Sequence, residues 1–137
     1  MLEITGLKNA VQAYERGLNV VLRKDDKSTP EDEIEILRSG LIQSFEFCYE
    51  LCWKYMKRWI EMNISPDAAD GVTRRELFRR AAENRLITDI DKWMIFHAAR
   101  NRTSHIYNED VADEVFKVAK TFLPFARDLV ERLESRL

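Results

Sequence analysis

The chain contains few of the residues that form tight turns or covalent cross-links. Of its 137 residues, four are glycine, three are proline and two are cysteine. Scarce glycine and proline indicate few turns and long elements, which favours helices over a strand-rich fold. Two cysteines, both within one predicted helix, are too few for the disulfide framework of a small secreted protein.

The sequence also lacks a strong charge of either sign and lacks long apolar runs. Its formal net charge is -2, with 34% charged and 45% hydrophobic residues. Without a global bias toward nucleic acids or anionic membranes, any anion-binding site must be local. No window reaches the roughly 18–20 apolar residues that span a membrane, and the N-terminal segment lacks the pattern of a signal peptide. We therefore expect a cytoplasmic protein that does not engage a membrane.

Apolar residues recur at steps of three and four along most of the chain, which is the spacing of one face of an α-helix. This pattern predicts three long helices, over residues 4–21, 30–62 and 108–133. Thr29 is the expected N-cap of the second helix, with Pro30 at its first position. Pro124 is expected to kink the last helix.

Two shorter helices are predicted between the second and the last long helix. Thr73 and Glu76 form a capping box that opens the first of them, and the other begins near Asp89. The apolar stripe of this other helix is Ile90, Trp93, Met94, His97 and Ala98. We therefore expect an all-α fold, an up-and-down antiparallel bundle of four to five helices, in a single domain over residues 1–137.

The stretch ARNRTSHIYNED places polar residues where the stripe of the preceding helix should continue. At 100° per residue, Asn101 lies in line with His97, and His105 lies one turn beyond Asn101. Arg100 lies only about 20° from the direction of Trp93. Buried polar groups cost roughly 1–3 kcal/mol each unless they have partners. Either a partner chain, a ligand or a solvent-filled cleft satisfies them, or the helix ends in solvent with its cations as caps.

Arg100 and His105 are five residues apart, so on a continuous helix their side chains point about 140° away from each other. They can meet if the helix ends near Ser104, or if a two-fold dimer brings two copies of the segment together. Such a dimer would gather two histidines and two arginines in one cleft. Cleavage of RNA without a metal requires a base for the ribose 2′-OH, an acid for the leaving oxygen and cations for the phosphorane charge. This set of residues supplies all three.

Three other groups of residues have both a structural and a functional interpretation. Cys48 and Cys52 have the spacing of half a zinc site, but no second pair lies near them, so we expect core cysteines and no metal. The tryptophans are expected to pack rather than to stack on bases. A short helix carries Arg74, Arg75, Arg79, Arg80 and Arg85. These arginines form either a solvated face or a track for ribose phosphates.

The segment RNRTSHIY has the form Arg-Asn-x3-His-x-Tyr and resembles the signature of HEPN-domain proteins. Among these it is most similar to the nucleotidyltransferase substrate-binding protein family, the HepT-like toxin partners of minimal nucleotidyltransferases. The likeness extends to the predicted second helix, LRSGLIQSFEFCYELCWKYMKRWIE, and to the segment TRRELFRRAAENRLITDIDKWMIFHAARNRTSHIYNED. It covers roughly residues 1–135.

This resemblance implies a HEPN bundle that forms a homodimer through its motif helices and acts as a metal-independent endoribonuclease without a cofactor. Arg100 and His105 correspond to the catalytic pair, assisted by Asn101. Tyr107 corresponds to the acceptor of AMP from a cognate minimal nucleotidyltransferase encoded nearby, which silences the nuclease as in a toxin–antitoxin pair. Candidate contacts to RNA or nucleotide are Arg75, Arg79, Arg102, Ser104 and His97.

A different role remains open for the same family. The chain could be a non-catalytic subunit that binds substrate or nucleotide for a two-component nucleotidyltransferase. A purely structural bundle is a third interpretation. The chain contains neither a glycine-rich phosphate loop nor the paired aspartates typical of a nucleotidyltransferase. We therefore do not expect it to be the transferase itself.

Overall fold

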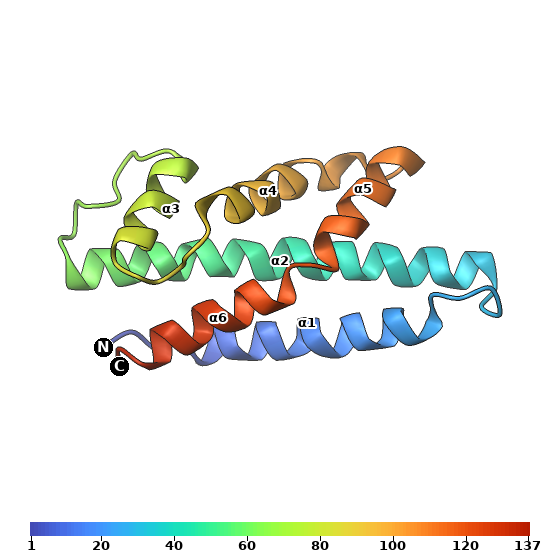
Figure 1. The fold of residues 1–137 in the computed structure, drawn as a ribbon, viewed down its shortest axis with the longest axis horizontal. Helices are drawn as coiled ribbons and strands as arrows, with labels where there is room; N and C mark the ends of the chain where they lie inside the picture. Colours follow the sequence, from blue (N-terminus) through green and yellow to red (C-terminus); the bar gives the residue numbers. More distant parts are fainter.

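The computed structural model describes residues 1–137 and consists of helices joined by turns (Figure 1). The elements are α1 Thr5–Lys24, α2 Glu31–Asn63, α3 Arg74–Glu83, α4 Ile90–Asn101, the 3-10 turn η1 Thr103–His105, α5 Glu109–Ala119 and α6 Leu123–Glu134. The predicted all-α helical bundle is confirmed.

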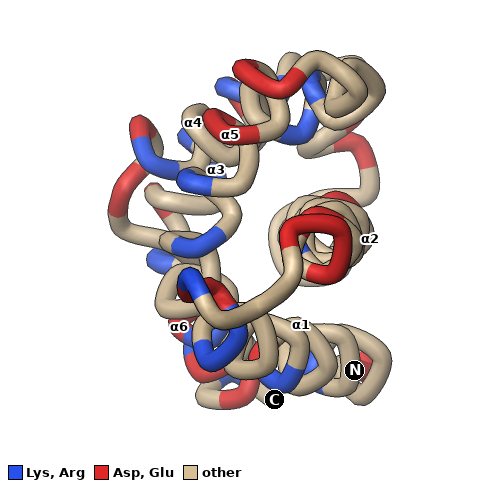
Figure 2. The backbone as a smooth tube through the Cα atoms, turned by 90° about the vertical axis from the view of Figure 1, so that its right-hand side faces the viewer, with Lys and Arg blue, Asp and Glu red and all other residues tan.

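The longest helix, α2, runs the length of the molecule between two groups of helices. α1 and α6 lie along one side of it, and α3, α4 and α5 lie along the other (Figure 1). The N- and C-termini meet at one end of the bundle. Figure 2 shows the molecule from the end at which α2 begins. Acidic residues are gathered at this start of α2.

Local capping fixes where the short helices begin. The Oγ1 atom of Thr73 accepts a hydrogen bond of 3.1 Å from the backbone N–H of Glu76, as the capping box predicts. A side-chain oxygen of Asp89 accepts one of 3.0 Å from the N–H of Lys92 and so starts α4. The predicted cap of α2 is wrong by one residue. Pro30 occupies the N-cap position and no side chain caps this helix.

The predicted last helix is two helices rather than one kinked helix. α5 ends at Ala119, and Pro124 lies in the first turn of α6, where a missing backbone N–H costs no helical hydrogen bond. The Tyr14 hydroxyl donates to the carbonyl oxygen of Ala119 at the end of α5, which also accepts a hydrogen bond of 3.2 Å from the backbone N–H of Phe122. The break also turns the Phe122 ring into the centre of the bundle.

Around Phe122 lies an aromatic cluster that joins four helices. Its ring is fully buried and lies 5.1 Å from both Phe45 and Phe96, 5.6 Å from Tyr14 and 5.9 Å from Trp93, measured between ring centroids. These edge-to-face contacts belong to a hydrophobic core of 36 buried residues. This core holds the end of α4 firmly against α2.

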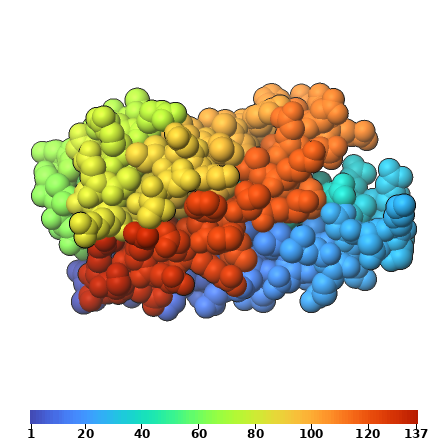
Figure 3. Space-filling view, in the orientation of Figure 1, coloured from blue at the N-terminus to red at the C-terminus, as the bar shows by residue number.

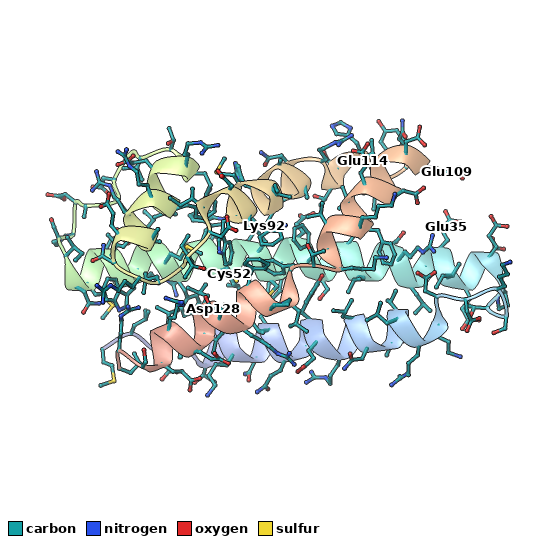
Figure 4. All side chains as sticks on the ribbon, in the orientation of Figure 1. Glu35, Cys52, Lys92, Glu109, Glu114 and Asp128 are labelled. Atoms are coloured by element: carbon teal, nitrogen blue, oxygen red, sulfur yellow. The ribbon has the colours of Figure 1, made fainter.

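Cys48 and Cys52 are fully buried within this core, as predicted, and Figure 4 shows Cys52 inside the bundle. Trp93 is also buried, whereas Trp53 is only partly covered. None of the helices combines the length and the apolar character that crossing a bilayer requires.

The buried face of α4 differs from the predicted stripe. Its core residues are Trp93, Phe96 and Ala99, whereas Ala98 is exposed. The buried residues follow one another at steps of three, so the buried face of α4 turns gradually around the helix axis. At the end of the helix this face reaches Arg100, which is half-buried, and not Asn101. Asn101 is exposed, and therefore the polar residue at the edge of the core is the arginine.

Candidate functional site

The motif residues lie where α4 gives way to a projecting turn. α4 ends at Asn101, and η1 follows over Thr103–His105. The side chain of Asn108 then accepts hydrogen bonds from the N–H groups of Asp110 and Val111 at 3.0 and 3.3 Å, which starts α5. The turn therefore runs directly from the end of α4 to the cap of α5.

Arg100 faces α2 and is held there by two carboxylates. Its Nε donates to Glu50 Oε1 at 2.8 Å, and its terminal nitrogen lies 3.7 Å from Glu46 Oε1. The second oxygen of Glu46 accepts a 2.5 Å hydrogen bond from the hydroxyl of the buried Thr103. Glu46 and Glu50 are four residues apart and so share one face of α2.

Glu46 and Glu50 were not among the site residues predicted from the sequence. Their i, i+4 spacing places both carboxylates on one face of a long helix and could have indicated a cation-binding pair. The same spacing is also common on ordinary solvated helix faces. Only the packing of α4 across α2 identifies their partner as Arg100. The pairing orients the guanidinium, and it leaves one face of α2 carrying negative charge beside the motif.

A second cation lies on the same stretch of α2. The other oxygen of Glu50 accepts a 3.1 Å hydrogen bond from the indole N–H of Trp53. The guanidinium carbon of Arg74, from the first turn of α3, lies 3.4 Å from the centre of the Trp53 ring. Thus Glu50 connects Arg100 on one side with the stacked pair of Trp53 and Arg74 on the other.

His97 links the buried core to the motif. Its Nδ1 lies 2.9 Å from the hydroxyl of the buried Tyr49, and its Nε2 lies 3.4 Å from the amide nitrogen of Asn101. Burial lowers the pKa of His97, and the positive charges of Arg74 and Arg100 lower it further. The imidazole is therefore neutral near pH 7. It can accept from the Asn101 amide only if it carries its proton on Nδ1 and donates it to Tyr49.

His105 and Tyr107 point away from the bundle. Both side chains are exposed, Tyr107 to 85%, and their ring centroids are 6.3 Å apart. This exposure excludes a packing role for the Tyr107 ring in the isolated chain. No hydrogen bond joins Arg100 to His105, because one side chain faces α2 and the other faces solvent.

The remaining predicted contact residues are dispersed. Arg102 is exposed and forms an ion pair with Glu114 on α5, and Ser104 is exposed on the turn. Arg75 and Arg79 lie on the outer side of α3, where Arg75 is 3.8 Å from Asp91 and Arg79 is 2.8 Å from Glu76. The structure therefore gathers Arg100, Asn101 and His97, but not Arg75 and Arg79.

A groove runs beneath the projecting turn, between the turn and the start of α2. Figure 3 shows the hollow between the orange segment near residue 110 and the cyan start of α2. One part, of about 910 Å³, is lined by Ile36, Glu46, Thr103 and Ile106 among others. An adjoining part of about 330 Å³ reaches Tyr107, with Glu35 and Glu109 on opposite walls (Figure 4). The structure contains no cluster of three or more His, Cys, Asp or Glu side chains that could hold a metal ion.

Comparisons with known proteins match the chain in sequence and in fold. Residues 2–135 match the family described as nucleotidyltransferase substrate binding protein like. The chain is 36% identical over 103 residues to a Haemophilus influenzae protein named probable ribonuclease HepT, a match that covers 74% of this chain and 70% of that protein.

Two solved structures have the same fold. One is a Haemophilus influenzae protein described as the substrate binding domain of a nucleotidyltransferase. It has a TM-score of 0.86 and 31% identity, and the match covers 96% of this chain and 99% of that one. The other is a Thermus thermophilus protein with a TM-score of 0.66 and 22% identity, covering 88% of this chain and 98% of that one.

Proposed function

The chain belongs to the nucleotidyltransferase substrate binding protein like family, and on that premise we propose that it is the HEPN-type partner of a nucleotidyltransferase and cleaves RNA without a metal ion. The similarity to a protein named probable ribonuclease HepT supports an RNA-cleaving role. The main support for the proposal is the arrangement of the motif, residues 100–107, at the turn between α4 and α5. It presents an oriented guanidinium, an amide and an exposed imidazole within six residues.

These groups fit the chemistry of RNA transesterification. A histidine removes the proton of the ribose 2′-OH, the 2′ oxygen bonds to phosphorus, and the bond from phosphorus to the 5′ oxygen breaks. A second histidine protonates the leaving 5′ oxygen, while arginine stabilises the charge that develops on the phosphorane oxygens. The products are a 2′,3′-cyclic phosphate and a 5′-hydroxyl. In this assignment His105 is the acid or base and Arg100 is the cation.

A second copy of the chain is needed to bring these groups together, since Arg100 and His105 do not touch within one chain. The outer face of α2 supports such a dimer. Ile36 and Phe47 are 72% and 62% exposed, and Gly40 between them has no neighbouring atom on its open side. These positions lie in line on the helix, and Ile36 and Gly40 line the groove below the motif. A copy that covers this face would enclose two motif turns in one cleft.

Tyr107 is the proposed acceptor of AMP from the partner nucleotidyltransferase. Its phenol is accessible to the active site of a second protein, and it lies beside His105. The phenolic oxygen would attack the α-phosphorus of ATP, release pyrophosphate and lose its proton to a base of the transferase. The attached nucleoside would block access to His105, and its phosphate would add negative charge at the motif. Modification would thus silence the nuclease, as in a toxin–antitoxin pair.

One observation favours a second candidate, a non-catalytic subunit that binds substrate for the transferase. Arg100 forms ion pairs with Glu46 and Glu50 in the isolated chain. Its guanidinium can bind a phosphate only if it gives up part of its contact with these carboxylates. The solved relative described as a substrate binding domain of a nucleotidyltransferase agrees with this alternative.

Cleavage of a labelled single-stranded RNA by the purified chain in the presence of EDTA tests the proposal. His105→Ala should reduce the rate by about 10²–10⁴-fold, the usual contribution of a general acid or base. His97→Gln should retain most of the activity and serves as the control imidazole. Binding of RNA or nucleotide without cleavage by the wild-type chain would favour the substrate-binding alternative instead.

A further inference from the structure

The arginines of α3 differ in what they contact. Arg79 and Arg80 both pair with Glu76, Arg75 pairs with Asp91, and Arg80 also donates to the carbonyl oxygen of Ala68 at 2.5 Å. Arg74 forms no ion pair and no hydrogen bond in the structure, and its Nε is buried without a partner. Of these four arginines, only Arg74 has its donors unused.

Stacking on Trp53 explains how Arg74 is held without a carboxylate. The guanidinium carbon lies over the indole at 3.4 Å from the ring centre, which covers one face of the group. A stacked guanidinium keeps its terminal N–H groups in its own plane, where they can donate two parallel hydrogen bonds to a phosphate. The indole is itself fixed by its hydrogen bond to Glu50. Arg74 is therefore oriented before any ligand arrives.

Arg74 is connected to the motif through side chains of α2. Its guanidinium stacks on Trp53, the indole N–H of Trp53 donates to one oxygen of Glu50, and the other oxygen of Glu50 accepts from Arg100. The charges of Arg74 and Arg100 add to the lowering of the His97 pKa that burial causes, in agreement with this placement. Since Glu50 contacts Arg100 directly, the result is a row of two planar cations along one face of α2, which ends at the motif turn.

We propose that Arg74, stacked on Trp53, is a second phosphate-binding position that holds a neighbouring nucleotide of the single-stranded RNA whose scissile phosphate lies at Arg100. The inference rests on the proposed function and assigns a substrate contact to residues outside the motif. It also gives the RNA a direction, from the motif turn toward the first turn of α3 and away from the acidic groove beneath Tyr107. That groove, lined by Glu31, Glu35 and Asp113, would repel a phosphate backbone.

The proposal is tested by RNA binding in a His105→Ala background, which prevents cleavage, with fluorescence anisotropy of a labelled 12-nucleotide RNA at several salt concentrations. Arg74→Ala should raise Kd about 10-fold at low salt. It should also reduce the slope of log K against log salt by about 0.7, the value for one lost phosphate contact on a single strand. Arg74→Lys should give a Kd between those of the parent and Arg74→Ala. A lysine keeps the positive charge, but it neither stacks on the indole nor donates two parallel hydrogen bonds to a phosphate.

Arg75→Ala is the matched control, since it removes the same charge from the adjacent position of the same helix. It should change Kd by less than about two-fold, because Arg75 already pairs with Asp91 on the outer side. Equal effects of Arg74→Ala and Arg75→Ala, or an unchanged slope in Arg74→Ala, would overturn the inference while leaving the proposed function intact. Absence of RNA binding in the His105→Ala parent itself would overturn both.

Discussion

Replacement of Glu50 by glutamine separates the contribution of this carboxylate to stability from its role in holding Arg100. Each oxygen of Glu50 accepts one hydrogen bond, from Arg100 Nε at 2.8 Å and from Trp53 Nε1 at 3.1 Å. Glutamine has the same shape but only one acceptor oxygen, so its NH2 group must face one of these two donors. Either Arg100 or Trp53 therefore loses its partner and meets a second donor.

The expected cost in stability is moderate. Hydrogen bonds to charged groups contribute about 1.5–3 kcal/mol when they are shielded. The Glu50 side chain is 29% exposed, so solvent screening reduces this figure to about 1–2 kcal/mol. For a chain of this size, 1 kcal/mol corresponds to about 3–4 °C in Tm. We expect Glu50→Gln to lower Tm by about 3–8 °C.

RNA binding and catalysis should change in opposite directions. Loss of a negative charge near the phosphate site removes a repulsion of about 1 kcal/mol, estimated for a separation of about 6 Å and an effective dielectric constant of about 50. RNA should therefore bind about five-fold more tightly. The rate constant kcat should fall about 10-fold or more, because Arg100 is no longer held in one orientation.

Thermal unfolding and single-turnover cleavage at several RNA concentrations measure both effects. Glu61→Gln is the matched control, because Glu61 is on the same helix, is 30% exposed and makes only a 3.8 Å pair with Lys57. Its Tm should change by less than about 2 °C, since exposed i, i+4 pairs contribute about 0.5 kcal/mol or less. An unchanged kcat in Glu50→Gln would refute the positioning of Arg100 by this carboxylate.

Three further predictions concern other parts of the molecule. Co-expression with the partner nucleotidyltransferase should add the mass of AMP to the wild-type chain and not to Tyr107→Phe, measured by intact mass; an unchanged addition in the variant would exclude this acceptor. The depressed pKa of His97 means that the unfolded chain binds a proton more readily than the folded one, so stability should fall as pH drops below about 6.5. His97→Gln should flatten this part of the curve of Tm against pH, and an equal slope in both proteins would contradict the assignment. Cys48 and Cys52 are both fully buried, and burial also raises the pKa of the Cys52 thiol. Neither should react with a thiol reagent until the chain unfolds, and rapid labelling of the native protein would show that this part of the core opens.

Much of the fold could be predicted from the sequence because its signals are local. The three- and four-residue steps of apolar residues and the Thr73 cap depend only on neighbours in the chain. The break before Pro124 could not be placed this way. It depends on Phe122 reaching a cluster formed by α1, α2 and α4, which are distant in sequence.

The candidate site was predictable only in part, for the same reason. The motif residues lie close together in sequence, and the family resemblance named them as candidates. The partners of Arg100 lie about 50 residues earlier on α2, and their role exists only after α4 packs across that helix. The difference between Arg74 and Arg75 is similar. In the sequence they are two adjacent arginines, and only the folded chain places one on Trp53 and the other beside Asp91.

The chemical nature of the cleaved RNA ends shows whether the chain cleaves by attack of the ribose 2′-OH without a metal ion. A defined single-stranded RNA would be incubated with the purified chain in EDTA, and its products would be identified by mass spectrometry. Attack by the 2′-OH with Arg100 and His105 predicts fragments ending in a 2′,3′-cyclic phosphate and beginning with a 5′-hydroxyl, which disappear with His105→Ala. Cleavage that requires an added divalent metal, or that leaves 5′-phosphate ends, would show that the chain does not use this metal-independent mechanism.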